Sequence, residues 1–175
     1  MTLAPADEEM QWLRRAREGD KAAFAALYLR YSPGVYTLAL RLSGQRSEAD
    51  DLTQETFLRA LQALAGFRAG SPLGPWLKRI TANLAIDRLR RIRPSDDIEL
   101  DALADTHEHS PARALDLLAA LQQLSPVWRS VVWLALMEGW SHRELADRYS
   151  RTESWSKSIL SRALARLKSL SEETL

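Results

Sequence analysis

The sequence predicts an all-α fold, organised as two small helical domains joined by a flexible acidic linker. Apolar residues recur at helical spacing along almost the whole chain, and the alternation typical of strands is absent. Residues 94–111 contain six acidic residues, no lysine or arginine, and only weak periodicity. A polar, charged segment of this kind cannot bury enough apolar surface to fold by itself. We therefore expect domains at 1–93 and 112–175, with a linker over 94–111.

Each domain is predicted to contain four helices. Those of the first domain span 6–18, 20–43, 47–65 and 73–92, and those of the second span 112–123, 126–138, 142–148 and 153–170. Four of these helices begin at, or directly after, a residue whose side chain can accept a hydrogen bond from the first turn, namely Asp20, Ser47, Ser125 and Ser141. Pro33 lies inside the second helix, where it can kink the backbone.

The composition excludes several functional classes. The chain has no cysteine, which rules out disulfides, thiolate metal sites and a cysteine nucleophile. No apolar run approaches the roughly 20 residues that cross a bilayer, and the start, "MTLAPADEEM", does not resemble a signal peptide.

His107 and His109 lack an organised third metal ligand, and no catalytic motif is found. We expect a cytoplasmic protein that is not an enzyme, has no cofactor and does not insert into a membrane.

Charge is strongly segregated, although the net charge is only +1. Residues 67–93 carry seven basic residues against one acidic residue, and residues 141–170 carry seven against three. By contrast, 47–58 ("SEADDLTQETFL") holds four acidic residues and no basic one. One basic block in each domain favours contact with a polyanion at two places, because lysine and arginine contacts to phosphate supply much of the affinity for nucleic acids.

The stretch "GWSHRELADRYSRTESWSKSILSRALARL" has the form of a helix-turn-helix, with a tight turn near 149–152. Apolar residues of its second helix form an inward stripe at Ile159, Leu160, Ala163, Leu164 and Leu167. Polar and basic residues remain for the other faces. Because recognition helices use their N-terminal half in the major groove, this helix is a candidate for reading DNA.

The order of motifs resembles that of the extracytoplasmic-function (ECF) sigma factors, the minimal two-domain members of the sigma-70 family. In the first domain the resemblance is carried by "EADDLTQETFLRALQAL" and "SPLGPWLKRITANLAIDRLRR". In the second it is carried by "LSPVWRSVVWLALMEGWSHRELADRYS" and "SKSILSRALARLK". It covers roughly residues 20–170. It implies a protein that binds core RNA polymerase, directs it to promoter DNA, and helps to melt the −10 region.

The resemblance implies a polymerase-binding role for one face of the helix over 47–65. Carboxylates there suit an arginine-rich partner helix. The residues implied to bind polymerase are Asp50, Asp51, Gln54, Glu55, Phe57 and Leu58.

The loop and helix that follow resemble the element that captures the single-stranded −10 DNA. Asn83 carries the donors and acceptors that base edges require, and the basic residues suit phosphate. The residues implied to bind −10 DNA are Arg68, Ser71, Lys78, Arg79, Asn83, Arg88, Arg90 and Arg91. Trp76 is interpreted as a core residue.

The second helix of the helix-turn-helix stands where the family reads the −35 element. The residues implied to bind it are Trp155, Lys157, Ser158, Ser161, Arg162 and Arg166. The family pattern is broken just here, because Ser154-Trp155-Ser156 replaces a usual Gly-Thr-Val and Ile159 replaces an arginine. We expect an unusual −35 preference, and Trp155 could either contact DNA or pack against the preceding helix. Thr152 or Ser154 could cap the helix.

Two other functions remain open at this stage. A stand-alone helix-turn-helix transcription factor would explain the second domain only. A sigma-like polymerase-binding protein that has lost promoter reading would explain the broken pattern. Most family members are held by an anti-sigma factor, so the resemblance also implies such a protein as a partner.

Overall fold

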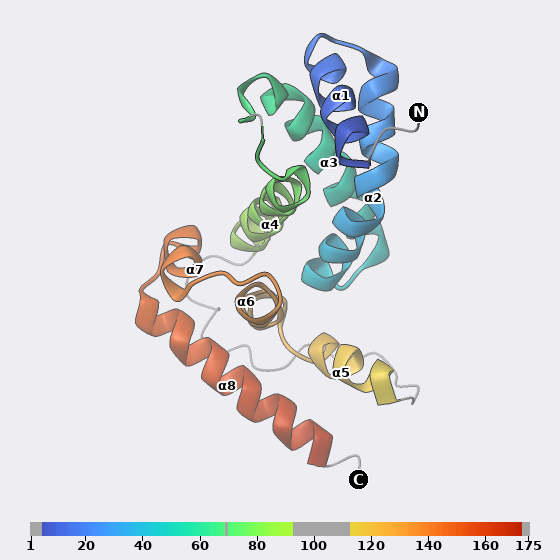
Figure 1. Ribbon diagram of the computed structural model, residues 1–175. Helices are drawn as coiled ribbons and strands as arrows, with labels where there is room; N and C mark the ends of the chain where they lie inside the picture. Colours follow the sequence, from blue (N-terminus) through green and yellow to red (C-terminus); the bar gives the residue numbers. More distant parts are fainter. Residues whose placement is uncertain (1–4, 69, 93–112, 173–175) are drawn as a thin grey trace. The chain divides into compact units, whose positions relative to one another are not determined.

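A computed structural model describes residues 5–68, 70–92 and 113–172 of the chain. Within these ranges the regular structure consists of eight α-helices and one short 3₁₀ turn, with no strand (Figure 1). The all-α prediction is therefore confirmed. No helix in the described part of the chain has the length and apolar character needed to cross a membrane.

The observed helices begin and end within two residues of the predicted boundaries. In the N-terminal half they are α1 (Pro5–Arg17), α2 (Lys21–Ser43), α3 (Arg46–Ala63), the 3₁₀ turn η1 (Leu64–Gly66) and α4 (Leu73–Ile92). In the C-terminal half they are α5 (Arg113–Gln122), α6 (Pro126–Leu136), α7 (His142–Tyr149) and α8 (Glu153–Glu172). The predicted linker over 94–111 lies outside the described residues.

The chain forms two compact units. Of the described residues, those within 1–40 and 45–84 form the first, and those within 41–44 and 85–175 form the second. Helices α2 and α4 each contribute residues to both units.

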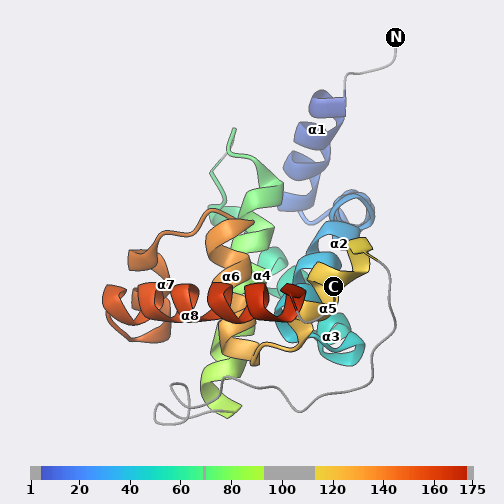
Figure 2. The same cartoon turned by 90° about the horizontal axis from the view of Figure 1, so that it is seen from below.

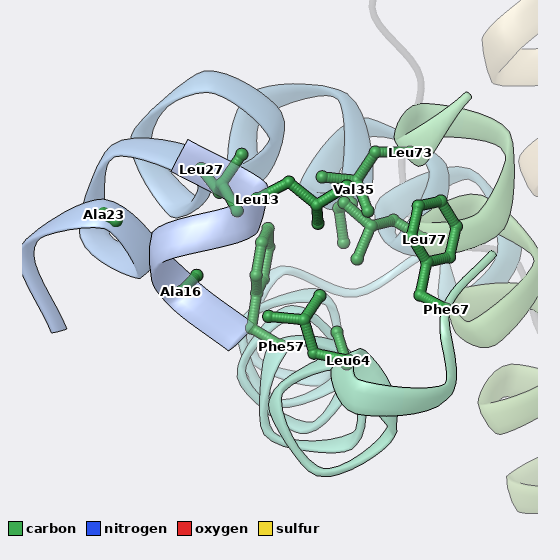
Figure 3. Packing of buried hydrophobic residues seen from close by; sticks show 11 residues of the cluster. Leu13, Ala16, Ala23, Leu27, Val35, Phe57, Leu64, Phe67, Leu73 and Leu77 are labelled. Atoms are coloured by element: carbon green, nitrogen blue, oxygen red, sulfur yellow. The ribbon is translucent and has the colours of Figure 1, made fainter. Parts of the chain in front are cut away.

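The first unit is held together by a core to which α1, α2, α3, η1 and α4 all contribute. Figure 3 shows these side chains converging between the helices. Phe57 lies near the centre, with its ring edge-on to Phe24 and 4.6 Å from Tyr28 between ring centroids. The cluster consists of Leu13, Ala16, Ala23, Leu27, Val35, Phe57, Ala60, Leu64, Phe67, Leu73 and Leu77.

The helix starts of the first unit agree with the sequence in one case and differ in another. Asp20 caps α2, because its Oδ1 accepts hydrogen bonds from the backbone N–H of Ala22 (2.8 Å) and of Ala23 (3.2 Å). The bond from Ala23, and next the one from the Arg15 side chain, lower the pKa of Asp20. The prediction that Ser47 caps α3 is wrong. The capping position is Gln45, whose side chain makes no capping bond, and Ser47 already lies inside the helix.

The second unit contains the predicted helix-turn-helix, formed by α7 and α8, with α6 packed against both (Figures 1 and 2). Ser125 caps α6, and Ser141 forms a capping box with Glu144 at the start of α7. Ser150 follows α7 as its C-cap residue and adopts the left-handed conformation with φ 55°. Thr152 then starts α8 by accepting a hydrogen bond of 3.1 Å from the backbone N–H of Trp155.

The interior of this unit includes polar groups that pair with one another. The hydroxyls of Ser130 and Tyr149 share a hydrogen bond of 2.5 Å. Ser156 is fully buried, and its hydroxyl lies 3.0 Å from Nδ1 of His142, which links the starts of α7 and α8. Buried polar groups are tolerated when they are hydrogen-bonded in this way.

Candidate polymerase and DNA interfaces

Helix α3 is divided lengthwise into a buried face and an exposed face. Leu52, Thr56 and Ala60 belong to the buried face. Asp50, Asp51 and Gln54 are exposed, so the carboxylates and the amide that the sequence singled out lie on one accessible surface. Glu55 is half-buried and pairs with Arg59 over 3.3 Å.

Phe57 does not belong to the exposed face of α3. Only 4% of its surface is exposed, and its ring packs against Phe24 and Tyr28. A direct polymerase contact by Phe57 is incompatible with this packing, because the ring has almost no surface left to offer. The sequence motif placed Phe57 correctly on α3, but the residue points into the core.

Leu61 extends the exposed face and was missed in the sequence. Leu58 is 60% exposed and Leu61 is 47% exposed. Asp51, Gln54, Leu58 and Leu61 are spaced three or four residues apart, so they follow one another along the same side of the helix. The face thus begins with carboxylates and continues into an apolar patch. The sequence did carry a signal for Leu61, because it lies three residues after Leu58 and so on the same side of the helix.

The loop between η1 and α4 carries Arg68 and Ser71. Arg68 is exposed, and its carbonyl accepts a hydrogen bond of 3.2 Å from the backbone N–H of Ser71. Before the loop, Phe67 is buried and its ring lies 4.7 Å from that of Trp76 between centroids. Trp76 packs against the core of the first unit, as expected.

Helix α4 displays the other predicted −10 residues along its length. Arg79, Arg90 and Arg91 are exposed, whereas Lys78, Asn83 and Arg88 are half-buried. Arg79, Asn83 and Arg90 are separated by four and seven residues, which puts them on one side of the helix. A row of guanidinium groups with an amide between them can bind phosphates and a base edge together.

Helix α8 presents a polar face that contains most of the predicted −35 residues. Lys157, Ser161 and Arg162 are exposed. Ser158 is half-buried, and its hydroxyl accepts two hydrogen bonds from Arg162, from Nε at 3.1 Å and from Nη2 at 2.6 Å. Lys157 Nζ lies 3.8 Å from a carboxylate oxygen of Glu153. Arg166, two turns beyond Ser158, is half-buried and donates to the Ser169 hydroxyl at 3.4 Å.

Trp155 lies inside the helix-turn-helix rather than on the exposed polar face of α8. It is 7% exposed and packs against Tyr149 of α7. The sequence left open whether Trp155 contacts DNA or packs against the preceding helix. In the structure it packs against that helix. Ser156, Ile159 and Ala163 are also fully buried on α8, whereas Leu164 is 42% exposed and does not join the predicted inward stripe.

Two family models match this chain, and together they include every predicted site residue. The model of sigma-70 region 2 matches residues 27–94, and that of sigma-70 region 4 matches residues 114–167. The first match includes α3 and α4. The second includes the helix-turn-helix.

Curated relatives lead to the same family. The chain is 36% identical over 139 residues to the RNA polymerase sigma factor CarQ of Myxococcus xanthus, with 76% of this chain and 80% of the relative covered. It is 36% identical over 159 residues to the ECF RNA polymerase sigma factor SigE of Mycolicibacterium smegmatis, with 82% of this chain but only 60% of the relative covered.

Solved structures resemble the fold. The sigma factor RpoE of Bartonella quintana, solved with the anti-sigma factor NepR, is 27% identical, with a TM-score of 0.56 and coverage of 85% of this chain and 96% of that one. CnrH, solved with the cytosolic domain of CnrY, is 27% identical with a TM-score of 0.55, covering 95% and 98%. With two family models in the order of the two units, and relatives of this identity, the chain belongs to the sigma-70 family, among the ECF RNA polymerase sigma factors.

Proposed function

We propose that this sigma factor binds core RNA polymerase and recognises promoters through two separate DNA contacts, one in each domain. The N-terminal domain, 1–93, would bind polymerase and the −10 element, and the C-terminal domain, 112–175, would bind the −35 element. The observation that carries this proposal is the division of α3 into a buried core face and an exposed acidic face. Exposed carboxylates repel phosphate, so this face favours a protein partner over DNA.

The polymerase contact is assigned to Asp50, Asp51, Gln54, Glu55 and Leu58, with Leu61 added. Carboxylates can form charge-assisted hydrogen bonds to arginine on the partner, and the exposed leucines can bury apolar surface beside them. Phe57 lies on the buried side of α3 and holds the helix against α2, which keeps the exposed face in place.

The −10 contact is assigned to the loop before α4 and to α4 itself. Arg68 and Ser71 lie in the loop, where a base leaving the stack can be received. We assign Asn83 to a base edge, and Lys78, Arg79, Arg88, Arg90 and Arg91 to phosphates. Binding the separated strand stabilises the open state, so the protein contributes binding energy to melting, while the chemistry of RNA synthesis belongs to the polymerase.

The −35 contact is assigned to the polar face of α8, with Lys157, Ser158, Ser161, Arg162 and Arg166 as the contacting residues. The paired Ser158 and Arg162 place a guanidinium on the outward side of α8, where arginine is well suited to a guanine edge. The family has an arginine at the position of Ile159. Because Ile159 is fully buried, this position offers DNA no side chain in this protein. An unusual −35 preference follows.

An anti-sigma factor is a further proposed partner. The solved relative RpoE is bound to an anti-sigma factor, and the exposed faces assigned here to polymerase and DNA are the surfaces that such a protein would have to cover. Since polymerase and chromosomal DNA are the proposed partners, we place the protein in the cytoplasm.

Run-off transcription with core polymerase and a genomic promoter library tests the function. The wild type is expected to give promoter-specific transcripts whose aligned starts show the −10 and −35 sequences. Asp51→Arg is expected to abolish them by placing a cation against the arginine-rich partner, and Arg162→Met should reduce them at promoters that depend on the −35 element. Lys168→Met, further along α8, is the matched control for the loss of one positive charge.

Three outcomes separate the alternatives. Strong, specific DNA binding in the absence of polymerase would favour a stand-alone helix-turn-helix factor. Polymerase binding with no transcript from any promoter would favour a sigma-like protein that has lost promoter reading. Transcripts that persist in Asp51→Arg would contradict the assignment of the acidic face.

A further inference from the structure

Helix α1 lies outside the segment that the region 2 model matches, because that match begins at residue 27. It nevertheless packs into the core of the first unit through Leu13 and Ala16. At its last residue, Arg17, the helix also contacts η1 with a polar group. This contact involves none of the residues assigned above to polymerase or DNA.

The guanidinium of Arg17 donates hydrogen bonds to three backbone carbonyls at and after the end of α3. Nε donates to Leu64 O at 3.0 Å, and Nη2 donates to Ala65 O at 3.5 Å and to Phe67 O. Carbonyls at the end of a helix lack partners within the helix and carry partial negative charge, so a cation is favoured there. Only arginine has donors arranged in a fork that can reach several such acceptors at once.

These carbonyls come directly before the loop that carries Arg68. The backbone of Phe67 is held at both its polar groups, because its N–H donates to Leu64 O at 3.2 Å and its carbonyl accepts from Arg17. Its side chain is fixed between the core and Trp76. On the far side of the loop, Leu73 is buried at the start of α4. The loop is thus attached to rigid structure at each end.

We propose that Arg17 is a positioning residue for promoter opening, which acts by fixing the loop that receives the −10 strand. The inference rests on the proposed function, since the loop is assigned there to −10 DNA. A receptor for a base discriminates between bases only if its groups are held near the productive geometry before the base arrives. Arg17 supplies this rigidity from α1, without contacting DNA itself.

The test uses full-length variants at two arginines of α1. Arg17→Lys keeps the charge but removes the fork, and Arg17→Met removes both. Arg14→Lys and Arg14→Met are the matched controls, because Arg14 is exposed one turn earlier on the same helix. If Arg17→Met fails to fold, Arg17→Lys still carries the test.

The first readout is amide hydrogen exchange in the free protein. Loss of charge-assisted hydrogen bonds in Arg17→Lys should accelerate exchange about tenfold in the peptide that contains Phe67 and Ser71. Peptides from α2 should exchange as in the wild type, and Arg14→Lys should change neither. An unchanged loop peptide would overturn the inference. So would uniform acceleration across the first unit, since that indicates a general loss of stability.

The second readout is base discrimination by the reconstituted holoenzyme. The ratio of transcription from a natural −10 element to transcription from single-base variants should fall towards one in Arg17→Lys, while polymerase affinity is unchanged. A ratio equal to that of the wild type would overturn the inference. If the wild type itself directs no promoter-specific transcription, the proposed function fails, whereas the exchange result still decides whether Arg17 holds the loop.

Discussion

The rings of Tyr149 and Trp155 pack against each other inside the helix-turn-helix, with centroids 5.1 Å apart and planes inclined by 47°. Tyr149 is the last residue of α7, and Trp155 lies in the first turn of α8. The pair therefore fixes the angle at which the proposed recognition helix leaves the turn. In the proposed function, Trp155 would affect −35 binding through this angle rather than through its own contact with DNA.

Replacing Trp155 should change stability before it changes recognition. Trp155→Ala removes a buried aromatic ring and should lower the free energy of unfolding by about 3–5 kcal/mol. Trp155→Phe keeps much of the packing and should retain −35 binding. Urea unfolding and DNA-binding titrations on the same samples measure both effects. A Trp155→Ala protein as stable as the wild type but deficient in −35 binding would instead indicate a direct DNA contact.

Neighbouring residues of α3 should show opposite effects. Phe57→Ala should destabilise the first unit by about 3–5 kcal/mol, because it empties the centre of the core. Leu58→Ala removes an exposed side chain and should change the free energy of unfolding by less than about 0.5 kcal/mol. It should nevertheless weaken binding to core polymerase. Thermal unfolding and a polymerase-binding assay separate the two. Equal stability losses would contradict the division of α3 into two faces.

Stability should decrease above about pH 10, the ordinary pKa of tyrosine. Burial raises the pKa of Tyr149 above that value, although the hydrogen bond with Ser130 lowers it in part. The neutral phenol is therefore favoured in the folded state. The stability that Tyr149 gains from this preference is fully present below the pKa of tyrosine in the unfolded state. It is lost as the pH rises towards the pKa in the folded state. Unfolding measurements from pH 8 to 11, at intervals of about one unit, would follow this loss.

Tyr149→Phe is the comparison for this pH dependence. It should lose about 1 kcal/mol at neutral pH with the hydrogen bond to Ser130, and then show a shallower decline in alkali. Burial also raises the pKa of Tyr31, to about 12, aided by its hydrogen bond with Glu9. That contribution has the same sign and is shared by both proteins, so the difference in slope isolates Tyr149. If the free energy of unfolding declined with pH at the same slope in both proteins, the alkaline loss could not be assigned to Tyr149.

Ser150→Gly should stabilise the second unit by about 1 kcal/mol. Ser150 is the C-cap residue that follows α7, with φ 55°. This left-handed conformation costs an L-residue with a side chain about 1–2 kcal/mol and costs glycine almost nothing. Ser150→Ala keeps the Cβ and should give no gain. Thermal unfolding of the two variants measures the difference. Ser150 is exposed in the turn. If Ser150→Gly and Ser150→Ala were stabilised equally, relief of the left-handed conformation could not be the reason.

Local chemistry determined much of this structure from the sequence. The helical period predicted all the observed helices, because each amphipathic segment repeats every three or four residues whatever its partner. Asp20, Ser125 and Ser141 marked helix starts correctly, since a cap needs only a short polar side chain and the next turn of backbone. The motif order of the two domains was also sufficient to indicate the family.

Tertiary packing decided which side of each helix meets the solvent. Phe57 and Leu58 are adjacent in one motif, yet Leu58 is exposed, whereas Phe57 is buried and packs against two aromatic rings of α2. Trp155 sits among polar residues in the sequence, yet it is buried and its ring packs against that of Tyr149 on α7. The role of Arg17 likewise depends on carbonyls nearly fifty residues away. Sequence periodicity specifies a face, but the neighbours that cover that face come from other parts of the chain.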